Sequence, residues 1–422
     1  MTSTAHLSGL QDPRRAHGAV AGSLLLLWAF ALPLFPGLAA AFTILAVGAV
    51  FVFHRKNLRW KMPSPQSPLF WAMAFYLLHV LGMLWSSNTA FGLFDLQIKA
   101  PLFVLPLVLC FLPGSARSGA TGMLFLFSIG CAFSVVWKAA MVVLRIVRDP
   151  MLTPSQEIFS SAFSSPMHPS YMALYLCVAI AAWYLTPAHR ALPRWVSTVV
   201  FLWLAVGVVF CASKLGWSVL ALLLPSMLLL RWKQKEVRAV LVGAMIVSAA
   251  LSAGLLAYSP YARDRVQEMW RAAGEEQHDA QANTSSTVRW HTWQAAIDLF
   301  KEHPVIGTGT GDIKDELMRL YNERGITYAQ EHRLNAHSQY LQSAACLGIG
   351  ALVCLILMLS APMAMGRAVG AVIPVAFGIL AANCIVESMM EVQAGVLFVS
   401  WLLFVLYLDP RSVASPASSP PQ

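Results

Sequence analysis

Long apolar runs separated by short charged segments make up most of the chain. A helix of about 20 apolar residues crosses a hydrocarbon core roughly 30 Å thick, and it satisfies its own backbone groups there. The pattern therefore predicts an all-α polytopic membrane protein. Its spans, about twelve, are expected at residues 19–34, 36–53, 68–86, 96–112, 119–143, 169–186, 196–212, 216–230, 239–257, 341–364, 371–387 and 392–408.

The spacing of these runs divides the chain into four parts. The first nine spans form a transmembrane bundle over residues 1–257, a single long polar loop covers 258–340, and the last three spans cover 341–408. Residues 409–422 are rich in Pro and Ser, which predicts a disordered tail.

Composition and charge fit this membrane reading. Hydrophobic residues make up 58% of the chain and charged residues 12%, with a net charge of +9. Fifteen of the 29 basic residues fall in short loops on one side, which the positive-inside rule assigns to the cytoplasm. Both termini and the tail are then cytoplasmic, the loops near 86–95, 144–168, 213–215 and 258–340 face outward, and the positive charge requires no nucleic-acid partner.

Two further features are read in the same way. Arg14 and Arg15 before the first apolar run would also suit a cleavable signal peptide, but a second span follows at once, which favours a retained first span. The seven cysteines all fall within predicted spans. They are expected to pack as small apolar residues and not to form a disulfide framework.

The long loop shows helical periodicity in three places. The stretch "YARDRVQEMWRAAGEEQHD" predicts an amphipathic helix, and a second helix begins with Ser285 or Ser286 as N-cap and stops at Pro304. A glycine-rich turn, "GTGTGD", leads to a third helix, "IKDELMRLYNERG", which Gly325 closes.

Arg289 is the first candidate for chemistry in this loop. The loop carries twelve acidic and nine basic residues, so any anion site there must use particular arginines held in geometry. Arg289 lies in the first turn of its helix, where a cation opposes the helix dipole and a bound phosphate would compensate; the alternative is a solvated surface arginine. Arg263 and Arg265 follow a membrane exit, where contact with lipid phosphates is the alternative.

His337 is the second candidate, because it stands directly before the tenth span. The start of a helix and nearby arginines would keep its ring neutral and able to accept a proton; the alternative is a cap or packing residue. His278, His291, His303 and His332 share the loop, but their spacing does not match a helical zinc pair, so no metal is expected.

Charged residues in or near the spans complete the candidate site. Lys99 and Lys138 fall within apolar runs, where each costs about 2.5–3.5 kcal/mol, so both should face the protein interior or an aqueous cavity. Lys214 lies in a very short outer turn, and Glu387 and Glu391 lie near the same surface. A cavity ringed by Lys214, Arg265, Arg289 and His337 would suit a diphosphate headgroup whose lipid tail stays in the bilayer; alternatively, Lys214 merely ends a span.

An ordered series of residues runs from the second loop helix into the tenth span: Arg289, Trp293, Ala296, Phe300, His303, Pro304, Gly307 and Gly309, followed by His337, Tyr340, Leu341 and Gly348. With this series the loop resembles that of the O-antigen ligases and the related O-antigen polymerases. The resemblance extends to the topology, about twelve spans with one large periplasmic loop before the last three, and it implies a GT-C-like fold. Two positions depart from the family: Lys214 stands where arginine is frequent, and Ser338 where asparagine is common.

The resemblance implies an inverting glycosyltransferase of the bacterial inner membrane with a periplasmic active site. It would transfer O-antigen from undecaprenyl diphosphate to the lipid A-core oligosaccharide in lipopolysaccharide biosynthesis, with no cofactor and no metal. His337 would be the general base, and Arg289 with Arg265 would hold the leaving diphosphate. Lys214 is a weaker member of that set, because an ammonium cannot grip phosphate in a bidentate way.

Three other functions remain open at this stage. An O-antigen polymerase shares the donor and differs in its acceptor, and a protein O-oligosaccharyltransferase would act on serine or threonine. The modest size of the loop at 144–168 favours the ligase over the polymerase. A transporter of lipid-linked glycans would place its binding groups near the bilayer midplane, whereas the candidates here lie at the outer surface. The sugar, the acceptor hydroxyl and the oligomeric state stay open.

Overall fold

The computed structural model describes residues 13–54, 60–111, 119–149, 151–153, 157, 161–271, 285–365 and 370–408. Every element in this part of the chain is a helix, which confirms the all-α prediction. The predicted tail at 409–422 lies outside the described residues.

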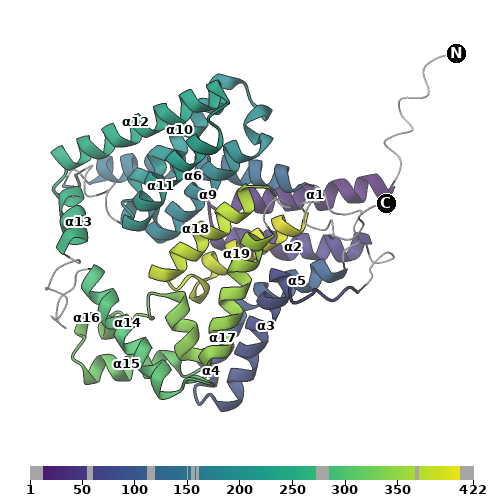
Figure 1. The fold of residues 1–422 in the computed structure, drawn as a ribbon, viewed down its shortest axis with the longest axis vertical. Coiled ribbons are helices and arrows are strands. Elements are labelled where there is room, and N and C mark those ends of the chain that lie inside the picture. The colour runs from purple at the N-terminus through teal and green to yellow at the C-terminus, as the bar shows by residue number, and fades with distance from the viewer. Residues whose placement is uncertain are drawn as a thin grey trace, which may run out of the picture.

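Each predicted span overlaps a helix of the bundle (Figure 1). Among the described residues, four helices are long and apolar enough to cross a membrane, a fifth span would be the bent pair α4 and α5, and seven further apolar helices are shorter. The count of twelve spans stays a prediction. The bundle helices are α1 (Pro13–Ala31), α2 (Pro36–His54), α3 (Pro68–Gly82), α4 (Thr89–Lys99), α5 (Pro101–Phe111), α6 (Ala120–Arg148), α9 (Pro169–Leu185), α10 (Arg194–Phe210), α11 (Lys214–Leu230), α12 (Lys235–Tyr258), α17 (Gln339–Ala364), α18 (Val372–Val386) and α19 (Gln393–Leu408).

The fourth predicted span differs from its prediction. It was expected as one helix over 96–112, but the chain forms α4 and α5, which bend by 41°. The break falls between Lys99 and Pro101, and proline, which has no backbone N–H, suits the first turn of a new helix.

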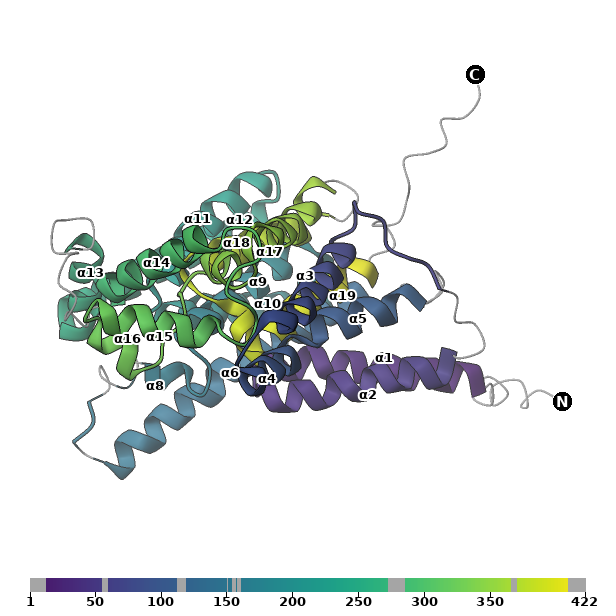
Figure 2. The same ribbon diagram turned by 90° about the horizontal axis from the view of Figure 1, so that it is seen from below.

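Two helices, α9 and α19, form the centre of the bundle (Figures 1 and 2). All residues of α9 from Ser170 to Tyr184 are buried, and α19 is buried along most of its length. Aromatic rings join them, as Tyr175 stacks on Phe398 with centroids 4.4 Å apart. A helix that is apolar on every side must be enclosed by protein or lipid, and here the other helices enclose it.

The intramembrane lysines and the cysteines lie as expected. Lys99 and Lys138 are both buried, with exposures of 0% and 4%. The Lys138 ammonium donates to the backbone carbonyls of Ser164 and Ser165 at 2.6 and 2.9 Å. All seven cysteines are buried and free, so the predicted absence of a disulfide framework holds.

The loop at residues 258–340, called the loop domain below, contains the three predicted helices and one more in its described part. They are α13 (Pro260–Arg271), α14 (Ser285–Glu302), α15 (Ile313–Glu323) and the additional α16 (Thr327–Glu331). The rest of the first predicted helix, with His278, lies outside the described residues. Gly325 follows α15 in a left-handed conformation, φ 65°. Helices α14, α15 and α16 gather beside the start of α17 at one end of the molecule (Figures 1 and 2).

The glycine-rich turn attaches the loop to a break in α17. Leu347 and Gly348 leave the helical conformation, with φ of −137° and 68°. The carbonyls of Ala345 and Cys346 accept the N–H groups of Thr308 and Gly309 at 3.0 and 2.9 Å. The break thus frees acceptors that a continuous helix would use internally, and the loop binds to them.

Asp312 attaches the same turn to the connection between α3 and α4. Its carboxylate accepts the backbone N–H of Ser87 at 2.8 and 2.9 Å and that of Asn88, the N-cap of α4, at 2.7 Å. The glycine-rich turn is therefore fixed to the bundle both at the break in α17 and at the start of α4.

Candidate active site

Polar side chains near the starts of α9, α14 and α17 converge on Glu387. It follows α18 and is only 3% exposed. One carboxylate oxygen accepts from Arg289 Nη2 at 2.7 Å and from Ser170 Oγ at 3.0 Å. His337 Nδ1 lies 3.6 Å from the other oxygen, and His168 Nδ1 lies 3.9 Å from the first. One buried carboxylate therefore joins α9, α14 and the start of α17.

Arg289 points into this site and not into solvent. Besides Glu387, its guanidinium donates from Nε to the Val386 carbonyl at 3.1 Å and from Nη1 to Ser285 Oγ at 2.7 Å. Its side chain is 21% exposed. The sequence predicted that a bound phosphate would compensate the positive charge of Arg289 at the start of its helix. In the structure, the Glu387 carboxylate partly compensates that charge. Since a guanidinium carries five N–H donors and three are used here, two remain for a ligand.

The backbone holds His337 in an unusual conformation. Its φ is 48°, in the left-handed region, which costs of order 1–3 kcal/mol for a residue with a side chain. The indole of Trp293 donates to the His337 carbonyl at 3.1 Å, and Asn335 Oδ1 accepts its N–H at 3.0 Å. These two bonds fix the peptide on both sides, directly before Ser338 caps α17.

The ring of His337 is oriented toward Glu387. Its Nδ1 is buried and makes no hydrogen bond of normal length among the described residues, and it lies 3.6 Å from a Glu387 carboxylate oxygen. The side chain is 22% exposed, so the ring is within reach of a substrate. From the sequence, only the helix start and nearby arginines were expected around this ring. The Glu387 carboxylate was not expected there.

Opposing effects set the charge of Glu387. Burial raises the pKa of its carboxyl, but His337, His168 and Arg289 together lower that pKa to about 2. Glu387 is therefore an anion throughout the neutral range, and it can pair with the arginine and orient the imidazole at once.

The structure brings Lys214 to the same region. Lys214 opens α11, and its ammonium donates to Ser286 Oγ at 3.2 Å, in the first turn of α14 and next to the serine that Arg289 contacts. Lys214 and Arg289 thus both contact serines in the first turn of α14, and Arg289 and His337 both face Glu387. Arg265 lies in α13, but its side chain is outside the described part of the chain, so its place in the site stays a prediction.

Sequence reasoning missed three residues of the site. Glu387 was noted only for its place near the outer surface, and His168 and Ser170 were not singled out. The signal for Glu387 was an acid directly after an apolar span, and for His168 a histidine before the Pro169 that opens α9. Neither signal identifies its partner, since Glu387 and Arg289 are 98 residues apart.

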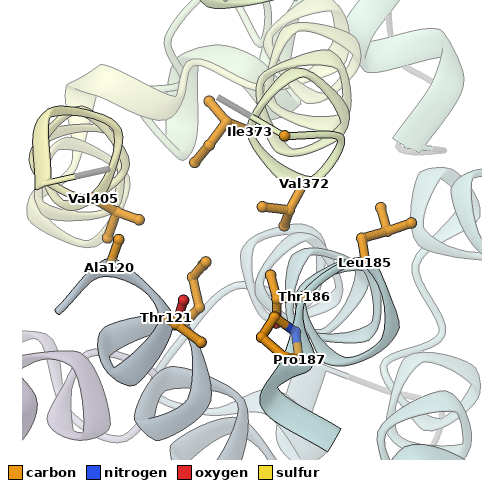
Figure 3. A pocket seen from close by; sticks show the side chains of 10 residues that line it. Ala120, Thr121, Leu185, Thr186, Pro187, Val372, Ile373 and Val405 are labelled. Carbon is orange, nitrogen blue, oxygen red and sulfur yellow. The ribbon is translucent and has the colours of Figure 1, made fainter. Parts of the chain in front are cut away.

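A small pocket lies elsewhere (Figure 3). Its lining includes Leu185 at the end of α9 and Val372 at the start of α18, whereas the site lies at the opposite ends of both helices. The lining contains no charged side chain, so it offers nothing to hold an anionic lipid headgroup.

Apolar helices around buried α9 and α19, with a polar site where a loop domain joins the bundle, define an α-helical membrane protein. The model of one family, described as O-Antigen ligase, matches residues 199–356. The matched region is similar to the O-antigen ligase family; it runs from α10 through the loop helices into α17 and includes Lys214, Arg289 and His337. No curated protein matches the chain. The family supports a glycosyltransferase type of activity on lipid-linked glycans.

Proposed function

We propose that this protein is an O-antigen ligase, an inverting glycosyltransferase that moves O-antigen from undecaprenyl diphosphate to the lipid A-core oligosaccharide without a metal. The observation that carries the proposal is the Glu387 carboxylate, which holds Arg289 at 2.7 Å and faces His337 Nδ1 at 3.6 Å. One anion thus sets a cation and an imidazole side by side at the outer end of the bundle.

His337 acts as the general base. With Glu387 facing Nδ1, the ring keeps its proton there and offers Nε2 to the acceptor hydroxyl, as a buried carboxylate does for a catalytic histidine. As the oxygen attacks the anomeric carbon, its proton passes to Nε2. The His337 side chain is 22% exposed, so an acceptor can approach it.

The leaving diphosphate is bound by cations on the other side of the sugar. Arg289 has two N–H groups left for phosphate oxygens, and Lys214 and Arg265 add positive charge. A diphosphate is already a good leaving group, so stabilising its charge and positioning the acceptor suffices for catalysis. Attack from the face opposite the diphosphate inverts the anomeric centre.

The polymerase is the nearest alternative, because it would use the same donor and the same base. A transporter is less favoured, because the site lies at helix ends and not on the broken helix at the midplane where transporters bind substrate. These alternatives differ in product, so a single assay separates them.

The test incubates purified protein in detergent with carrier-linked glycan, with and without lipid A-core. A ligase forms the core-linked glycan, and a polymerase lengthens the carrier-linked glycan without core. A transporter forms neither product. Activity retained in EDTA is expected, and inhibition that zinc or magnesium reverses would overturn the metal-independent mechanism.

His337→Ala should abolish this transfer while the protein keeps its thermal stability. His332→Ala is the matched control, because that ring is exposed and packs on Tyr328 in α16, away from Glu387. Near-wild-type turnover of His337→Ala would remove the base assignment.

A further inference from the structure

A second polar network lies buried beside the site. Lys99, at the end of α4, has no exposed surface. Its ammonium contacts the Asp95 carboxylate one turn earlier and donates to Glu391 Oε2 at 3.1 Å. Asp95 pairs with the lysine within α4. The bond to Glu391 adds a link between segments 292 residues apart.

Gln339 extends this network to the start of α17. It is fully buried, and its Nε2 donates to Glu391 Oε1 at 3.2 Å. Its Oε1 accepts the backbone N–H of Met390 at 2.6 Å. Both ends of the Gln339 amide therefore hold the segment from Met389 to Glu391.

The network joins the two partners of the proposed catalytic pair. Glu387 lies four residues before Glu391 in one connection, and His337 lies two residues before Gln339 in the other. A bond between Gln339 and the 389–391 segment therefore fixes the segment of Glu387 relative to that of His337. Lys99 fixes both to α4, the outer half of the broken span.

We propose that Asp95, Lys99, Glu391 and Gln339 are positioning residues that set the approach of Glu387 to His337. This inference rests on the proposed function. None of the four contacts Arg289 or His337 directly through its side chain in the described structure, so they act through the backbone segments that they hold.

The sharpest variant is Gln339→Met, which keeps the side-chain length and introduces no charge. It removes both bonds to the 389–391 segment while Lys99, Asp95 and Glu391 stay paired. We expect kcat to fall roughly 10- to 100-fold, the size of effect that a small misplacement of catalytic groups produces. The KM for the carrier-linked donor should change little, because Arg289 keeps its contacts. Gln330→Met is the matched control, since the side chain of that glutamine donates to Asn322 at the surface of the loop domain.

Lys99 provides a second test that separates positioning from folding. Lys99→Arg keeps the charge and should retain most activity, whereas Lys99→Met removes the cation that pairs with both Asp95 and Glu391 and should lose activity with a changed pH profile of kcat/KM. The double swap Asp95→Lys with Lys99→Asp keeps a pair within α4 but breaks the link to Glu391. It should behave like Gln339→Met while α4 stays folded.

Hydrogen exchange gives a readout that does not depend on turnover. In Gln339→Met, amides of residues 335–341 and 387–392 should both exchange faster, and those of α9 should not. Wild-type kcat and pH profile in Gln339→Met, or activity loss that only follows the folded fraction, would overturn the inference. If wild-type protein transfers no glycan, the proposed function fails, and unchanged exchange in both segments would then reject the network separately.

Discussion

The negative charge of one residue, Glu387, determines much of the electrostatics of the site. Glu387 is enclosed by Arg289, His337, His168 and Ser170, so its ionised form is stabilised in the folded state only. Without it, Arg289 would be a partly buried cation with no anionic partner, which is strongly unfavourable.

The stability of the protein should depend on pH through this group. The pKa of Glu387 is lowered from an ordinary value of 4.5 to about 2 in the folded protein. The stabilisation is therefore fully present above pH 4.5 and is lost as the pH falls toward 2. Thermal unfolding in detergent should show a loss of Tm in this window. Glu387→Gln should have a lower Tm at neutral pH and a smaller dependence on pH between 5 and 3, and an equal dependence in both proteins would contradict the assignment.

Arg289→Lys should lose most transfer activity. An ammonium can replace one bond to Glu387, but it cannot also reach Val386 and Ser285 and still bind phosphate with a planar fork. The measurement is kcat/KM for the carrier-linked donor. The exposed Arg319→Lys, on the outer face of α15, is the control. Full activity in Arg289→Lys would mean that Arg289 has only a structural role.

Among the elements, α17 is the one whose irregularity matters most. Its break at Gly348 presents two carbonyls to the glycine-rich turn, so the loop domain docks by backbone hydrogen bonds. Helix α17 begins at Gln339, directly after its N-cap Ser338 and two residues after His337. The docking of the loop domain and the position of His337 therefore depend on the same helix.

Gly348→Ala should destabilise this junction by roughly 2 kcal/mol, because the residue has a positive φ. A Cβ there would also lie 2.2 Å from the Val305 carbonyl oxygen. Gly350→Ala is the control in the same helix, where the nearest atom is 3.7 Å away. The measurements are Tm in detergent and the rate of proteolysis within residues 285–340. Equal behaviour of the two variants would show that the junction does not need this glycine.

Helix positions followed from the sequence because apolar runs and caps are local signals. The pattern predicted Ser285 or Ser286 as the N-cap of α14, and the helix begins at Ser285, so its start is one or two residues earlier than predicted. The predicted end of α15 at Gly325 agrees with the structure. The short α16 was not predicted, since five residues carry no periodicity. The break in α17 was also not predicted, because an apolar run looks the same whether its backbone is continuous or interrupted.

The sequence predicted the two cations and the histidine of the candidate site but not its acid. The structure places Lys214 and Arg289 at the first turn of α14 and His337 beside Glu387. Glu387 was not predicted as their partner, because a contact across 98 residues depends on how α14 and α18 pack and leaves no trace in either segment alone.

At the scale of the molecule, the alternation of helix directions is consistent with the expected topology. Arg194 and Glu236, at the starts of α10 and α12, pair at 2.7 Å, and the rings of Phe51 and Phe111, at the ends of α2 and α5, lie 6.1 Å apart. All four belong to helix ends predicted on the cytoplasmic side.

Cysteine labelling in cells tests that orientation. The seven native cysteines are buried, so the wild-type protein should react little with a membrane-impermeant maleimide. Glu331→Cys, exposed in α16, should react from the periplasm, and Lys233→Cys, exposed between α11 and α12, only after permeabilisation. The reverse pattern would invert the topology and place the site in the cytoplasm.

The bond between Arg289 and Glu387 bears on which anions the site admits. An incoming anion must share the guanidinium with the Glu387 carboxylate, which already accepts from it at 2.7 Å. A lone phosphate or sulfate offers little beyond what Glu387 supplies, whereas a lipid-anchored diphosphate adds a second phosphate and a tail held by the bilayer. Small inorganic anions should therefore compete poorly at Arg289 with the lipid-linked diphosphate that the proposed function requires.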